Sequence, residues 1–231
     1  EAEIKAEETT RLSKKEVLEI LEDAKPRFVF SDHNSHCAHF IGWLEQIPSI
    51  EKIIFFDTET TGTDPDFHEI IELAVIIARQ VEREGKGPKI EIIEECEWKI
   101  KMERPERAEE QALRVNGYNE VDWMFAVDRK KAMEEFSKKT QSCTFVSHNL
   151  VFDYNFVMKA FEETGVENNM HYGKLDTISI AFARLYDAKL ADKFSLKYLC
   201  ELLKVENSKA HTALADTRAL VEVYKKMMGA Y

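Results

Sequence analysis

The spacing of apolar and polar positions predicts an ordered series of strands and helices from residue 52 onward. Residues 52–58 form an apolar run with little alternation, which is typical of a strand buried on both faces. Further strands are expected at residues 70–81, 90–101 and 143–149. Residues 174–186 are expected to begin as a short strand and to continue as a helix. The other expected helices are residues 104–115, 128–139, 151–165, 195–205 and 212–228. Strands followed by alternating helices and strands predict an α/β fold, with a mixed sheet flanked by helices.

The first fifty residues have a different pattern. Residues 1–12 are acidic and polar, a capped amphipathic helix is expected from Ser13, and a strand-like piece, a polar loop and a short helix follow up to Pro48. We therefore expect a small helical N-terminal extension, residues 1–50, before a main domain, residues 51–231. The polar loop contains four soft ligands, namely His33, His36, Cys37 and His39. No second ligand pair at zinc-finger spacing follows them, so an ordinary polar loop is favoured over a zinc site.

The amino-acid composition excludes several classes of function. A net charge of −11 over 231 residues argues against a protein that neutralises many phosphates along a duplex. No apolar stretch reaches the ~18 residues that span a bilayer, so no membrane association is expected. Four separate cysteines without a CxxC pair are typical of a reducing cytoplasm, where disulfide frameworks are rare.

The first candidate functional residues lie at the end of the first predicted strand. Asp57 and Glu59 are two positions apart, so both side chains point to one face of the strand, at the carboxyl end where open α/β sheets place their sites. Two like charges this close are unfavourable unless a cation lies between them. Taken alone, the pair is equally well explained as two solvated acids at a strand end. The glycine that follows, Gly62, favours a site, because a tight turn lets a ligand approach the backbone.

Two later segments carry further candidates. Asp153 falls about one turn into the helix after the strand at 143–149, and Asp216 lies just inside the last helix, with His211 in the loop before it. Each acid has a structural explanation as well, because a carboxylate in a first turn interacts favourably with the helix dipole. Asp176 is expected to cap the helix that begins at Thr177.

Three motifs in this order, "FFDTETTG", "VSHNLVFDYNFV" and "HTALADT", resemble those of the DEDDh (DnaQ-like) family of 3′–5′ exonucleases. This family includes the proofreading subunit of bacterial DNA polymerase III, RNase T and oligoribonuclease. "LDTISIAFARLY" and "SLKYLCELL" look like two of its helices, and the resemblance covers roughly residues 52–228. It implies an RNase H-like fold with a mixed five-stranded sheet.

The resemblance also implies an enzyme that uses two divalent metal ions, Mg²⁺ or Mn²⁺, to hydrolyse a phosphodiester. Such ions prefer oxygen ligands, which explains a carboxylate set. By this resemblance Asp57 would bridge both ions, Glu59 and Asp216 would complete the first site, and Asp153 would act near the second. His211 would be the general base that takes the proton from the attacking water, a role that suits an imidazole because its pKa lies near neutrality.

The expected substrate is a single-stranded DNA or RNA 3′ end, with nucleoside 5′-monophosphates as products and DNA somewhat favoured. Thr61, Asn149 and Phe152 are candidate contacts to the terminal nucleotide, although Phe152 fits a core position equally well. The stretch "QALRVNGYNEVDW" departs from the family's "HGIT"-like turn, which leaves RNA 3′-end trimming as the alternative. Proofreading, repair, a homodimer and a polymerase partner all stay open, and the chain's end within the last helix favours a free-standing nuclease.

Two other readings compete with a nuclease. A phosphatase with an aspartyl nucleophile would need an aspartate where Glu59 stands and has no role for "HTALADT". A non-catalytic nucleic-acid-binding module would have to keep all five catalytic-type residues without using them.

Overall fold

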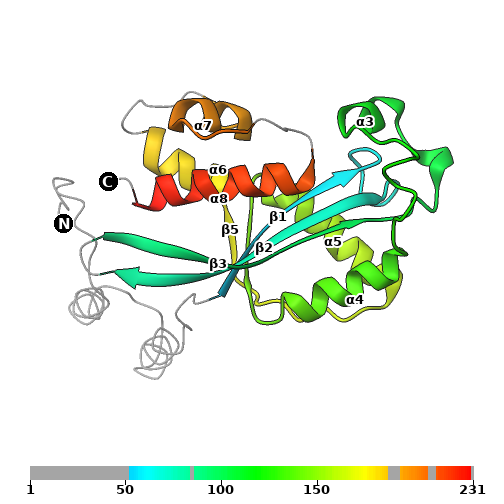
Figure 1. Ribbon diagram of the computed structural model, residues 1–231, viewed down its shortest axis with the longest axis horizontal. Coiled ribbons are helices and arrows are strands. Elements are labelled where there is room, and N and C mark those ends of the chain that lie inside the picture. Colours follow the sequence, from blue (N-terminus) through cyan, green and yellow to red (C-terminus); the bar gives the residue numbers. More distant parts are fainter. Residues whose placement is uncertain (1–51, 84–85, 187–192, 208–211, 230–231) are drawn as a thin grey trace, which may run out of the picture. The chain divides into compact units, whose positions relative to one another are not determined.

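The computed structural model describes residues 52–83, 86–186, 193–207 and 212–229 (Figure 1). The predicted N-terminal extension, residues 1–50, lies outside this part of the chain. Its helix, its histidine- and cysteine-containing loop and the boundary at residue 51 therefore stay predictions. Among the described helices, none is long and apolar enough to cross a lipid bilayer.

One mixed five-stranded sheet lies at the centre of the described domain, in the order β3–β2–β1–β4–β5 (Figure 1). The strands are β1 (Lys52–Thr60), β2 (Ile70–Arg83), β3 (Lys86–Lys99), β4 (Thr144–Ser147) and β5 (Lys174–Asp176). β1 is antiparallel to β2 and parallel to β4, so it is the middle strand. β2 pairs antiparallel with β3, and β4 pairs parallel with β5.

Helices cover both faces of this sheet (Figure 1). They are the 3₁₀ turn η1 (Pro105–Arg107), α3 (Glu110–Val115), α4 (Arg129–Lys139), α5 (Leu150–Thr164), α6 (Thr177–Ala181), the π-helical turn η2 (Phe182–Tyr186), α7 (Leu196–Leu203) and α8 (Ala213–Gly229). Helices α4 and α5 lie against one face, and α6, α7 and α8 lie on the other. The predicted mixed sheet flanked by helices is confirmed, and Asp176 caps α6 as expected by accepting a hydrogen bond from the amide of Ile178.

The continuous apolar run of β1 follows from this layering. Ile54 and Phe56 pack into the core against α4 and α5, whereas Ile53 and Phe55 pack into the core against α8. All four are fully buried, because a central strand between two helical layers has no solvent face. The same burial fixes the register of the strand, so its carboxyl end delivers the next residues to a defined place.

The prediction of one continuous helix over residues 104–115 is wrong in detail. The chain forms η1, then passes through extended backbone at Ala108 and Glu109, and only then enters α3. A tertiary contact accounts for the break, because the amide of Glu109 donates to the carbonyl oxygen of Thr61 at 2.8 Å instead of to a helical neighbour. This contact joins the η1–α3 segment to the end of β1.

Candidate active site

The end of β1 presents the first two carboxylates. Asp57 and Glu59 are half-buried, and they follow a run of four fully buried residues, Ile53 to Phe56. The pairing of β1 with β2 changes register between Glu59 and Thr60, which bends the strand away from the sheet directly after the second carboxylate. Glu59 lies opposite Glu72 of β2 in this ladder.

The third carboxylate comes from the other end of the described chain. Asp216 lies in the first turn of α8, the helix that packs against β1, β2 and β3. One oxygen from each of Asp57, Glu59 and Asp216 can be chosen so that all three lie within 4.8 Å of one another. The structure thus brings together three of the five residues that the motifs singled out.

Asp153 lies beside the group formed by Asp57, Glu59 and Asp216. It is buried in the first turn of α5, where its carboxylate accepts three hydrogen bonds: from the amide of Thr58 at 3.0 Å, from the Thr58 hydroxyl at 2.7 Å and from the Ser147 hydroxyl at 2.6 Å. Burial raises its pKa to about 6, although these hydrogen bonds act in the opposite direction. Asp153 is therefore held rigidly by β1 and β4, close enough to Asp57 to repel its charge.

The electrostatics of the site favour a cation. Burial, followed by the charges of Asp153, Glu59, Asp216 and Glu72, raises the pKa of Asp57 well above its ordinary value. Burial and the charges of Glu72, Asp216 and Asp153 raise the pKa of Glu59 to about 8. Carboxylates that are this unfavourable in their ionised form gain most from a bound positive charge. The all-oxygen donor set fits a small hard divalent ion such as Mg²⁺ or Mn²⁺.

The remaining predicted residues have different surroundings. His211 lies outside the described residues, so its role as a base stays a prediction. Thr61 is fully buried, and its hydroxyl accepts a hydrogen bond from the amide of Glu69, so its side chain holds the turn after β1. Asn149 is exposed with φ of 65°, in the left-handed conformation that starts α5. Phe152 is partly buried, packed against the core and 5.0 Å from the Phe156 ring centroid.

Sequence reasoning missed two polar side chains. Glu72 is 1% exposed, and its carboxylate accepts a hydrogen bond from the amide of Ala213 at 2.9 Å. Asn207 donates through Nδ2 to Oδ1 of Asp216 at 2.6 Å. The signal for Glu72 was present in the sequence, because a lone acid in the apolar stretch "IIELAVII" is rarely buried without a partner. Nothing in the sequence distinguishes Asn207.

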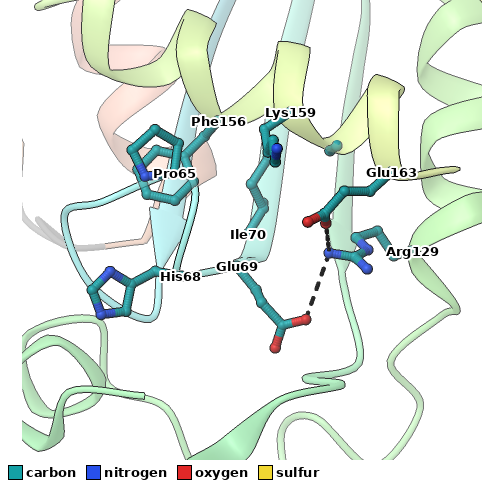
Figure 2. A pocket seen from close by; sticks show the side chains of 9 residues that line it. Pro65, His68, Glu69, Ile70, Arg129, Phe156, Lys159 and Glu163 are labelled. Atoms are coloured by element: carbon teal, nitrogen blue, oxygen red, sulfur yellow. Dashed lines mark hydrogen bonds and ion pairs between the residues drawn. The ribbon is translucent and has the colours of Figure 1, made fainter. Parts of the chain in front are cut away.

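A partly buried ion network around Glu69 supports the segment between β1 and α3. Figure 2 shows a small pocket in which Arg129 pairs with both Glu69 and Glu163, at 3.6 and 2.6 Å. Glu69 also pairs with Arg104 at 3.2 Å and accepts hydrogen bonds from the amides of Glu103 and Arg104. None of the residues that line this pocket is a candidate catalytic carboxylate. The network joins β2, η1, α4 and α5, and so fixes the η1–α3 segment that touches Thr61.

Comparison with known proteins gives a consistent result. Residues 54–224 match the model of the family described as exonuclease (RNase_T). The DNA polymerase III PolC-type of Staphylococcus aureus (strain bovine RF122 / ET3-1) is 27% identical over 176 residues, which are 76% of this chain but only 11% of that protein. Among solved structures, the zinc-bound E. coli exonuclease I–single-stranded DNA complex superposes with a TM-score of 0.62 at 18% identity, over 76% of this chain and 40% of that one. Exonuclease I from Methylocaldum szegediense gives 0.58 at 17% identity, again over 76% and 40%.

Proposed function

This chain belongs to the exonuclease family, in its DEDDh (DnaQ-like) 3′–5′ branch, and we propose that its site removes nucleoside 5′-monophosphates from the 3′ ends of single-stranded nucleic acid. The observation that carries this proposal is the convergence of Asp57, Glu59 and Asp216, with oxygens within 4.8 Å of one another. The chain spans about a tenth of the polymerase it resembles and less than half of the exonuclease I chains, so the activity and the substrate of this chain are both proposals.

Asp57, Glu59 and Asp216 would hold a divalent ion, and Asp153 would contribute to a second. Two such ions, when bound, supply the positive charge that lets a nucleophile approach an anionic phosphodiester and that stabilises the leaving oxygen. Asp153 suits a position beside the first group, because its three hydrogen bonds fix its carboxylate without any rearrangement. His211 would accept the proton of the attacking water, a role supported by its place in the "HTALADT" motif.

Substrate positioning would come from the rim of the site. Asn149 is exposed at the start of α5, one turn before Asp153, where its amide can reach a nucleotide. The partly exposed ring of Phe152 offers a surface for base stacking, which tolerates any sequence. Thr61 would act through the turn that it stabilises. The acidic chain suits a short single strand held at its end, because binding a long duplex needs many phosphate contacts.

DNA is the substrate we favour over RNA. The S. aureus relative is named as a DNA polymerase, and the E. coli exonuclease I structure contains single-stranded DNA. Proofreading and DNA repair would both use this chemistry, and the name of the S. aureus relative supports a polymerase partner for the first of them. A homodimer stays a prediction.

A substrate panel tests the proposal. The protein is incubated with 5′-labelled single-stranded DNA, RNA, recessed duplex ends and dinucleotides at one concentration of Mg²⁺ or Mn²⁺, and the products are resolved by length. We expect shortening from the 3′ end, faster on DNA than on RNA, and none with Asp57→Ala. Faster cleavage of RNA would favour 3′-end trimming instead. No cleavage of any substrate, or full activity of Asp57→Ala, would contradict the proposal.

A further inference from the structure

Glu72 is a buried carboxylate that neither the motifs nor the three-carboxylate group uses. It lies in the middle of β2, opposite Glu59, with 1% of its side chain exposed. Burying a carboxylate is costly unless a hydrogen-bond donor or a cation compensates it. A strand that keeps an acid here needs it for a contact that an apolar residue cannot make.

That contact is made with the start of α8. The Glu72 carboxylate accepts a hydrogen bond from the amide of Ala213, the first residue of the helix, at 2.9 Å and across 141 residues of sequence. First-turn amides have no partner within their own helix and are usually satisfied by a side chain just before it. Here the partner comes from the central sheet, so the contact fixes where α8 begins relative to β2.

A second contact acts on Asp216 itself. Asn207, in the loop after α7, donates through Nδ2 to Oδ1 of Asp216 at 2.6 Å. The amide of Asp216 bonds to the carbonyl oxygen of Thr212 at 3.0 Å, which places Asp216 one helical turn from the residue that Glu72 holds. Glu72 therefore sets the position of the first turn, and Asn207 sets the orientation of its carboxylate.

We propose that Glu72 and Asn207 are positioning residues that hold Asp216 against Asp57 and Glu59, so that the three carboxylates can share a divalent ion. Without them the like charges would drive Asp216 away, because oxygens of the three carboxylates lie within 4.8 Å of one another and repel when ionised. The inference rests on the metal-dependent hydrolysis proposed above. It identifies the side chains that preserve the geometry of the proposed metal ligands. Loss of such outer partners typically weakens metal binding by about 10- to 100-fold.

The test compares Glu72→Ala with Glu72→Gln. Glutamine has no charge, but its side-chain oxygen can still accept the hydrogen bond from Ala213. Mn²⁺ binding is measured by calorimetry on the folded full chain without substrate, and urea unfolding in a chelator reports stability separately. We expect Glu72→Ala to weaken Mn²⁺ binding by about 10- to 100-fold, and Glu72→Gln to stay within a few-fold of the unmodified protein.

Two further variants sharpen the result. Asn207→Ala should weaken Mn²⁺ binding in the same direction as Glu72→Ala, because it removes one hydrogen bond that orients the Asp216 carboxylate. Glu134→Ala is the control, since Glu134 is an exposed acid on α4, which lies on the other face of the sheet from α8. It should leave Mn²⁺ binding unchanged.

Each other outcome has a definite meaning. Unchanged Mn²⁺ binding in Glu72→Ala would overturn the inference even if its stability fell. A Glu72→Gln variant as defective as Glu72→Ala would also overturn it, because the charge and not the hydrogen bond would then matter, as for a fourth metal ligand. If the unmodified protein binds Mn²⁺ but cleaves no nucleic acid, the proposed function fails while the positioning test still stands.

Discussion

Neutralising one of the proposed metal ligands should stabilise the metal-free protein while it abolishes activity. Asp57 sits among four other acids whose charges raise its pKa, namely Asp153, Glu59, Asp216 and Glu72. Asp57→Asn keeps the shape of the side chain and removes its charge. In a chelator this relieves repulsion in the folded state only, because the unfolded chain holds these acids far apart. The variant should therefore have a larger free energy of unfolding than the unmodified protein.

The size of the gain follows from the geometry. At 4.8 Å and an effective dielectric constant of about 20, Coulomb's law gives about 3.5 kcal/mol for one pair of ionised carboxylates. Asp57 takes part in two such pairs, with Glu59 and with Asp216. Water in the half-exposed site screens part of this repulsion and proton uptake relieves more, so we expect a gain of about 2–4 kcal/mol near pH 8.

The gain should depend on pH with a definite sign. Glu59 has a pKa of about 8 in the folded protein and an ordinary value of 4.5. An acid with a raised pKa binds more protons in the folded state, so the metal-free protein loses stability as the pH rises between these two values. The advantage of Asp57→Asn should therefore be greatest at pH 8 and should decrease toward pH 4.5.

Urea unfolding followed by circular dichroism provides the assay, with each protein measured in a chelator and in Mn²⁺. Mn²⁺ should reverse the order of stability, because a ligand that binds only the folded state stabilises the protein that binds it more tightly. Glu120→Gln removes an exposed acid and is the control, with an expected change within about 0.5 kcal/mol. If Asp57→Asn is no more stable than the unmodified protein at pH 8 in chelator, the carboxylates are not a repelling cluster and the metal argument loses its basis.

Three other substitutions test the scaffold by urea unfolding. Phe55→Ala should cost about 3–5 kcal/mol, because Phe55 is fully buried between β1 and α8; a loss below about 1 kcal/mol would show that α8 is not packed there. Glu69→Ala should cost about 1–3 kcal/mol, since it leaves the amides of Glu103 and Arg104 without their acceptor, and an unchanged midpoint would contradict the network. Gly62→Ala places a Cβ atom 2.4 Å from Nε2 of His68 and should cost about 1–3 kcal/mol; His68→Ala in the same chain should recover part of this loss, and additive effects would rule out the clash.

The sequence predicted the central part of the fold well. β1 was recognisable because a strand buried on both faces needs an uninterrupted apolar run, and Asp57 and Glu59 were placed by the two-residue period alone. Asp216 could be placed on a helix but not next to β1 by pattern, because the docking of α8 is a long-range contact. Only the order of the motifs brought these residues together before the structure did.

The features that the sequence did not reveal share one physical cause, which is contact between residues distant in the chain. The break at Ala108 and Glu109 depends on a hydrogen bond to Thr61, which local helix propensity does not contain. The hydroxyl of Thr61, which stays a predicted nucleotide contact, accepts a hydrogen bond from the amide of Glu69, a contact that the sequence pattern does not reveal. The hydrogen-bond donor to Glu72 could not be foreseen from the sequence, because it lies 141 residues away.

The late arrival of α8 has a consequence for how the protein matures. β1 and β2 can pair as a hairpin early, but the ion-binding centre stays incomplete until α8 has been synthesised and has docked, and contacts this distant in sequence form slowly. A nascent chain on the ribosome would then carry its acids without the power to cut. The activity would therefore appear only once α8 has docked and has brought Asp216 to Asp57 and Glu59.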